Sequence, residues 1–209
     1  MADMRKVLNL TSFKIRQRQS IAQHVWCAPL TNSDPDTIQA DMIFLCSLVN
    51  KDGAEPDTYS LDLQSFSEIN ISLWCRLLRF RTLSEILHGP VDHTALQHFG
   101  MILFMMTVFL YNDRGQVVDY VLVRHCIEHT HAGISPELDS QGAIWFLLLS
   151  LIWMAERAEC ASLRETLRTA AGRLNVSSWE GIRSIISGLP WIDVLHEDVG
   201  RSLWNGLLL

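Results

Sequence analysis

Residues 143–155, AIWFLLLSLIWMA, determine the fold class of this chain. Their apolar side chains follow one another almost without interruption, which predicts a helix buried on nearly all of its sides. A helix that crosses a membrane needs about 20 residues, whereas this run has 13. A second run of the same length, FGMILFMMTVFLY at residues 99–111, has the same character. The two runs therefore predict the buried centre of a helical bundle and no membrane span.

The rest of the chain divides into amphipathic segments that are separated by turn-forming residues. Apolar residues recur at helical spacing in most segments, and only residues 59–63 and 117–123 alternate as a strand would. We expect helices over residues 37–50, 67–88, 93–111, 117–131, 139–156, 161–174, 177–187 and 191–205. The expected fold is all-α, an irregular multi-helix bundle of about seven to nine helices.

Several of these helices have recognisable ends in the sequence. Asp36 is expected to cap the first helix, and Gly89 followed by Pro90 is expected to stop the second. Asn175 predicts the end of the helix over 161–174. Ser177 or Ser178 is expected to cap the next helix, because a glutamate follows Ser177 at the spacing of a capping box.

Composition and charge limit the class of protein. Hydrophobic residues make up 48% of the chain and charged residues 19%, which excludes a disordered chain. We expect a basic, turn-rich arm at residues 1–34 and a single helical domain at 35–209. The net charge of −6 argues against polyanion binding by the chain as a whole. The basic arm at residues 1–34 either binds nucleic acid or is simply exposed to solvent, and the second interpretation is favoured. Five cysteines without a C-x-x-C pair predict a reduced, intracellular protein.

Residues 125–129, HCIEH, match the H-x-x-E-H zinc motif of inverted metalloproteases. On a helix, His125 and His129 share one face, and Glu128 is placed to act as general base toward a metal-bound water. A catalytic zinc needs a third protein ligand, for which Glu197 is the candidate. The same histidines also suit the last turn of an amphipathic helix, where they favour the helix dipole. The helix-end interpretation is favoured; a metal site and a pH- or metal-responsive surface patch remain alternatives.

The methionines of the second apolar run suggest a further candidate site. Met101 and Met105 lie at helical spacing, and with Trp145 of the first run they form a candidate lipophilic ligand pocket. Methionine also fills irregular gaps in ordinary cores. The core interpretation is favoured over the pocket.

Residues 177–204 combine three tryptophans with an acidic run, DVLHED at 193–198. Apolar residues at helical spacing accompany Trp179 and Trp191, so we expect the tryptophans to pack two helices together as a hairpin. The acidic run is expected on the solvent side, with Asp193 at the positive end of the last helix. Arg201 is spaced to pair with Glu197 or with Asp198. We interpret this segment as structural, and we predict no catalytic residue in it.

The same segment resembles the C-terminal end of the regulatory domain of fungal-specific transcription factors. In that family a Ser-Trp-x-x-Ile/Val-Arg helix leads into a hydrophobic-Trp-Ile/Leu-Asp turn. An acidic helix with Gly-Arg-x-Leu-Trp follows. The matching residues are Ser178, Trp179, Arg183, Trp191, Asp193, His196, Gly200, Arg201 and Trp204. The resemblance covers residues 70–206 and includes residues 142–155 as the apolar central helix of the family.

The resemblance implies a nuclear module, with the cytoplasm as the alternative location. It also implies action through protein partners, self-association or a small-molecule ligand. Members of the family normally carry an N-terminal zinc cluster of six cysteines, and this sequence has no such pattern. Direct DNA binding by this chain is therefore not expected. A stand-alone regulatory domain and a part of a larger gene product both remain open.

We therefore expect a non-enzymatic, transcription-regulator-like helical domain that acts through protein–protein contacts or ligand response. Two alternatives remain open. One is a small metal-dependent hydrolase that uses His125, Glu128 and His129, and the other is a helical module that binds a lipophilic ligand. The sequence contains no nucleotide- or dinucleotide-binding motif, so no cofactor is predicted.

Overall fold

The computed structural model describes residues 34–51, 63–81, 83–109, 120–135, 140–154 and 160–207. These residues form helices and connecting turns, and none of them lies in a strand. The helices are α3 (Pro35–Lys51), α4 (Leu63–Phe80), α5 (Leu83–His88), α6 (His93–Phe109), α7 (Tyr120–Ala132), α8 (Ser140–Met154), α9 (Ala161–Arg173), α10 (Trp179–Ile185), the 3-10 helix η3 (Ile186–Gly188) and α11 (Asp193–Asn205). The predicted all-α, multi-helix bundle is confirmed.

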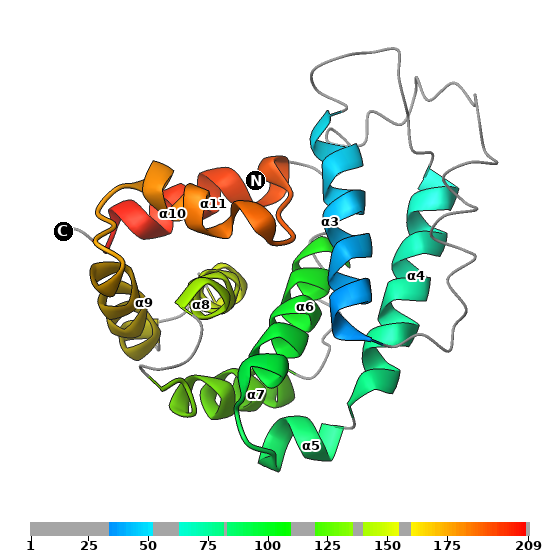
Figure 1. The fold of residues 1–209 in the computed structure, drawn as a ribbon, viewed down its shortest axis with the longest axis horizontal. Coiled ribbons are helices and arrows are strands. Elements are labelled where there is room, and N and C mark those ends of the chain that lie inside the picture. The colour runs from blue at the N-terminus through cyan, green and yellow to red at the C-terminus, as the bar shows by residue number, and fades with distance from the viewer. Residues whose placement is uncertain are drawn as a thin grey trace.

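Helix α8 lies at the centre of the bundle, as its apolar sequence predicts. Figure 1 shows it end-on, surrounded by α6, α7, α9 and the α10–α11 pair. Helices α6, α9 and α11 contact it directly. The side chains of residues 144–151 are all buried. Complete burial explains why the sequence of α8 has no polar face.

Helix α6 crosses α8 at close range because a glycine lies at the crossing point. A Cβ atom on Gly100 would lie 2.5 Å from Cζ3 and 2.8 Å from Cε3 of Trp145. The Trp145 ring therefore occupies the space that any other residue at position 100 would need. Its indole Nε1 donates a hydrogen bond of 3.0 Å to the carbonyl oxygen of Pro190, which connects α8 to the turn before α11.

Two helix ends follow the sequence signals. Asn175 has a φ of 54°, and it ends α9 in a left-handed conformation that asparagine tolerates better than most residues. The amide of Val176 donates to the carbonyl of Ala171, and that of Asn175 to the carbonyl of Gly172. This is the hydrogen-bond pattern of a Schellman motif. Gly89 follows the last residue of α5, as predicted.

Two expectations about helix ends need correction. The cap of α3 is Asp34, not Asp36, because Oδ2 of Asp34 accepts the amide of Thr37 at 3.0 Å. Pro35 then occupies the first helical position, where a missing N–H costs nothing. The single helix expected over 67–88 is two helices, α4 and α5, with a break after Phe80. Arg81 at this break pairs with Asp92, 3.4 Å away.

The break has a physical reason in the tertiary structure. It turns the chain so that α5 contacts α7, which a straight continuation of α4 would not reach. The arm expected at residues 1–34 lies outside the described residues apart from Asp34. Of the second alternating segment, residues 120–123 are helical, and the rest lies outside the described residues.

Across the described residues, every helix is too short or too polar to cross a bilayer.

The α6–α8 crossing gives the first prediction. The Gly100→Ala variant is expected to lose about 1–3 kcal/mol of unfolding free energy, because the new methyl group overlaps the Trp145 ring. Gly172→Ala is the control: this glycine lies in α9, and a Cβ there meets nothing within 4 Å. It should gain about 0.5–1 kcal/mol from the better helix propensity of alanine. Urea denaturation checks both values, and equal stability of the two variants would contradict the close crossing.

Candidate functional site

The C-terminal residues that carry the family resemblance lie close together in space. Helix α10 begins after Ser178, whose Oγ accepts the amide of Gly181 at 3.1 Å. Trp179, Trp191 and Trp204 are all buried. The rings of Trp179 and Trp191 contact each other at a centroid distance of 6.2 Å. These contacts hold α10 against α11.

A glycine makes this contact possible. A Cβ atom on Gly200 would lie 2.6 Å from Cη2 of Trp179 and 3.2 Å from Cη2 of Trp191. The two indole rings therefore rest directly on the backbone of α11. This packing accounts in physical terms for the glycine in the Gly-Arg-x-Leu-Trp pattern.

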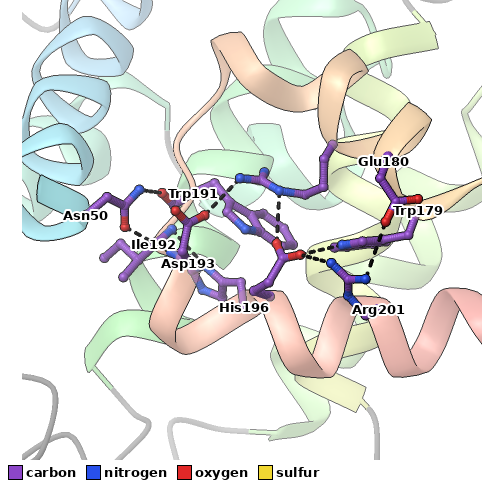
Figure 2. Close-up of polar contacts among 10 residues, drawn as sticks. Asn50, Trp179, Glu180, Trp191, Ile192, Asp193, His196 and Arg201 are labelled. Carbon is purple, nitrogen blue, oxygen red and sulfur yellow. Dashed lines mark hydrogen bonds and ion pairs between the residues drawn. The ribbon is translucent and has the colours of Figure 1, made fainter. Parts of the chain in front are cut away.

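Charged side chains cover the outer side of this tryptophan cluster (Figure 2). The guanidinium of Arg183 lies over the Trp191 ring, 4.9 Å from its centroid. The same group binds Asp193 at 2.8 Å and Glu197 at 3.0 Å. A cation on an aromatic face with two carboxylate partners is a favourable, partly desolvated arrangement. Arg183 therefore fastens α10 to the start of α11.

Glu197 is the shared acceptor of this network. Its Oε1 accepts hydrogen bonds from Nε1 of Trp179 and from Arg201, the latter at 3.0 Å. Arg201 also contacts Glu180 at 3.3 Å. Partial burial acts to raise the pKa of Glu197. The hydrogen bonds from Trp179 and Arg201, together with the charges of Arg183 and Arg201, nevertheless hold this pKa below its ordinary value. Glu197 is thus a charged acceptor that is already engaged.

His196 is the residue that the sequence interpretation misplaced. It was expected on the solvent side with its acidic neighbours, but the structure buries it completely. Its Nδ1 accepts the amide of Ile192 at 3.1 Å, so this nitrogen carries no proton. Nε2 therefore carries the proton, and it donates a hydrogen bond of 2.8 Å to Oγ1 of Thr107. The Thr107 hydroxyl in turn donates to the carbonyl of Phe104 at 2.7 Å.

The surroundings of His196 keep it neutral. Its ring lies between Phe104 and Trp191, at centroid distances of 5.6 and 4.9 Å. Burial, and to a lesser extent the charge of Arg183, lowers the pKa of His196 to about 3. Both ring nitrogens are used, so His196 connects α6 to α11 and is not free to act as a base. A sequence signal existed, because His196 lies four residues from both Ile192 and Gly200 on the buried side of α11.

Asn50 was also missed by the sequence analysis. Its Nδ2 donates to the carbonyl of Trp191 at 2.9 Å, and its Oδ1 accepts the amide of Asp193 at 2.9 Å. The side chain thus binds the backbone at both sides of Ile192, where α11 begins (Figure 2). It connects α3 to the C-terminal pair of helices, across more than 140 residues of sequence.

The H-x-x-E-H residues lie on α7 but do not converge on one point. His125 is exposed. Glu128 binds Arg124 of the same helix at 2.7 Å. Nε2 of His129 contacts the carbonyl of Gly89 at 3.1 Å, which makes this nitrogen a donor in the turn between α5 and α6. Glu197, the candidate third ligand, belongs to the α10–α11 network. Within the described ranges, no three His, Cys, Asp or Glu residues could share a metal ion.

The candidate ligand pocket does not coincide with a small cavity found among the described residues. Met101, Met105 and Trp145 are buried in the core between α6 and α8. A cavity of about 10 Å³, the room of one water molecule, lies instead between α5, α6 and α7. His98 lines it, with its Nε2 donating to the carbonyl of Leu77 at 2.8 Å. Nδ1 of His98 is buried without a protein partner among the described residues.

The surface of α4 carries an apolar stripe. Ile71 is 58% exposed and Leu78 is 64% exposed, the two highest values among the large apolar side chains of the described residues. Cys75 is also exposed and lies between them. The spacing of four and three residues puts all three side chains on one face of the helix. We refer to Ile71, Cys75 and Leu78 as the α4 stripe.

Comparisons with known proteins give no assignment. No family model, no curated protein and no solved structure matches this chain.

The histidines of α7 allow the helix-end and metal interpretations to be separated. His129→Ala should lower the free energy of unfolding by about 1 kcal/mol, because the carbonyl of Gly89 loses its donor. His125→Ala, at an exposed position of the same helix, should change stability by less than about 0.5 kcal/mol. Denaturation with and without added zinc is the measurement. A zinc-dependent stability that both variants lose equally would contradict this account.

Burial of His196 predicts a loss of stability in acid. The unfolded chain binds a proton at this histidine near pH 6.5, whereas the folded chain does so only near pH 3. Between these values the unfolded state binds more protons, so stability falls as the pH falls, by about 1.4 kcal/mol per pH unit from this group. His98 and His131, whose pKa values are lowered by burial, act in the same direction.

The measurement is the unfolding free energy of wild type and His196→Gln at several pH values between 7 and 4. Wild type should be the more stable protein at pH 7, and its advantage should shrink as the pH falls. Parallel curves for the two proteins would show that His196 does not titrate as its burial requires.

Proposed function

We propose that this chain is a non-enzymatic, transcription-regulator-like helical domain that acts through protein–protein contacts. The observation that carries the proposal is the α4 stripe. Exposed apolar residues scattered singly on a surface need no explanation, but three that line one helix face form a contiguous surface. Such a face, read at positions i, i+4 and i+7, is the form in which helices are recognised by partner proteins.

The chemistry of the described polar residues supports the same proposal. Both ring nitrogens of His196 are engaged in the fold, Glu128 binds Arg124, and His129 holds the turn after α5. The clusters that could suggest catalysis thus have structural partners. The resemblance of residues 177–204 to regulatory domains of fungal-specific transcription factors supports a role in transcription and a nuclear location.

A ligand-responsive role receives less support. The three residues of the candidate lipophilic pocket are buried in the core, and the cavity of about 10 Å³ beside His98 has the room of about one water molecule. Contacts through the surface therefore form the leading proposal.

A reporter assay tests the proposal. The full chain is fused to a heterologous, sequence-specific DNA-binding domain, and reporter output is measured in cells. The wild-type fusion should change reporter output severalfold relative to the DNA-binding domain alone. The Ile71→Glu/Leu78→Glu variant should lose that effect, because two charges replace the apolar contacts of the α4 stripe.

Val194→Glu is the matched control, since Val194 is 49% exposed on α11, away from α4. It should retain the wild-type effect, and all three fusions should be present at equal levels. A wild-type fusion that behaves as the DNA-binding domain alone would refute the regulatory proposal. An effect that survives in Ile71→Glu/Leu78→Glu would refute the role of the stripe.

A further inference from the structure

We propose that the junction of α4, α5 and α6 is an acid-responsive hinge. When His98 binds a proton, α5 and the turn at residues 89–92 detach from α6, while the rest of the bundle stays folded. The inference rests on the position of His98 at this junction, on the surroundings of its two ring nitrogens and on the weak attachment of α5. It does not depend on the proposed function.

Helix α5 lies at the edge of the bundle. Figure 1 shows it between the end of α4 and α7, and it has only six residues. Arg81, before α5, binds Asp92, after it, at 3.4 Å. The Asp92 side chain is 53% exposed, so solvent weakens this ion pair. His129 of α7 binds the carbonyl of Gly89 at the end of the helix. A short element held by contacts of this kind opens more easily than a core helix.

His98 of α6 packs against the end of α4, where the chain turns toward α5. Its side chain is buried. Its Nε2 donates to the carbonyl of Leu77, in the last turn of α4, at 2.8 Å. The ring also meets the ring of Phe80, the last residue of α4, edge-on at a centroid distance of 5.1 Å. His98 therefore supports the place at which α4 ends.

The second ring nitrogen cannot hold a proton favourably in this arrangement. Because Nε2 is the donor, Nδ1 of the neutral ring is an acceptor. Nδ1 is buried and has no protein partner among the described residues. A proton on it would create a buried N–H group without an acceptor, together with a buried positive charge. The closed junction therefore favours the neutral form of His98.

The charges around the junction also disfavour protonation. The described titratable or charged side chains here are Arg81 at the break, Glu85 of α5, Asp92 of the turn and His129 of α7, with the exposed His88 and His93 beside the turn. The Arg81 guanidinium lies 5.9 Å from the centroid of the Phe80 ring, which His98 also contacts. Burial lowers the pKa of His98. The hydrogen bond to Leu77 opposes this effect, and the charge of Arg81 adds to it.

Detachment of α5 brings water to His98 without opening the core. The cavity of about 10 Å³ lies between α5, α6 and α7, and His98 lines it. Ile86 of α5 and Val91 of the turn also line it, and both are only partly buried. Moving them outward widens this cavity toward solvent and leaves the contact between α6 and α8 in place. A six-residue helix is unstable alone, so α5 unwinds as it detaches.

The direction of the pH dependence follows from these two states. In the open state the His98 ring is hydrated, and its pKa returns to the ordinary value of 6.5. In the closed state the pKa is lower, so opening takes up a proton when the pH is below 6.5. The open population then rises as the pH falls, by up to about tenfold per pH unit. Above this range the population is constant, and the closed state is favoured.

Amide hydrogen exchange of Gly89 measures the opening, because its N–H donates to the carbonyl of Glu85 at 2.9 Å and is released when α5 unwinds. After correction for the intrinsic exchange rate, its opening constant should rise about five- to tenfold from about pH 7.5 to about pH 5.5. Its opening free energy should lie below that of the amides of residues 144–151. Exchange of Gly89 at the same free energy as these α8 amides would reveal global unfolding alone and would overturn the proposal.

Two glutamine variants separate this hinge from the acid effect of His196. His98→Gln retains a donor toward the carbonyl of Leu77 but does not titrate, so the pH dependence at Gly89 should disappear. His196→Gln is the matched control at a second buried histidine, and Gly89 should keep its wild-type pH dependence there. A dependence that survives in His98→Gln, or that is lost in His196→Gln, would overturn the proposal.

A titration of wild type keeps the proposal testable even where His98→Gln does not fold. In NMR spectra, the ring signals of His98 and the amide signals of residues 85–89 should change with one common midpoint below pH 6.5. Arg81→Gln should move that midpoint to higher pH, because a neighbouring positive charge and the ion pair with Asp92 are both removed. Ring signals that titrate without any change in α5 would refute the hinge, as would an unshifted midpoint in Arg81→Gln.

Discussion

The structure depends on the complete burial of α8. A helix without a polar face is stable in water only when other elements cover it on every side. Helices α6, α9 and α11 provide that cover through direct contact. At the crossing with α6, the Trp145 ring occupies the space that a side chain at position 100 would need. Since these partners come from both sides of α8 in the sequence, the bundle has to close around it as one unit.

The polar groups inside the bundle connect helices that are distant in the sequence. Buried donors and acceptors are costly unless they are paired, so each pair fixes how two elements meet. His196 and Thr107 fix α11 on α6, Trp145 and Pro190 fix α8 on the turn before α11, and Asn50 fixes α3 on the same turn. Three contacts thus converge on residues 190–196. This convergence gives a structural reason for the compact pattern of tryptophan, histidine and glycine in the C-terminal segment.

The sequence predicts those features that depend on neighbouring residues. The apolar run of α8 and the helix stop at Asn175 are local, and each is found where its pattern indicates. Of the two candidate serines, Ser178 caps α10, one residue after the serine that the capping-box spacing indicates. Features that depend on distant contacts were missed. The break between α4 and α5 follows from the contact of α5 with α7, and the burial of His196 follows from Thr107, 89 residues away. The H-x-x-E-H motif on α7 is a further example. The roles of its residues are determined by the groups that they contact in the fold, and the spacing of the residues does not reveal those groups.

The described residues thus have two kinds of role. Interior polar groups hold the helices in place, while the α4 stripe is the surface through which we propose that the chain acts. Both roles require a folded bundle, and the bundle depends on the burial of α8. Native-state amide hydrogen exchange tests it most directly, because amides that open only on global unfolding report the full unfolding free energy. The account predicts that amides of residues 144–151 exchange with that full value and those of α4 with a lower one. Exchange of the α8 amides at a lower free energy than those of α4 would contradict it.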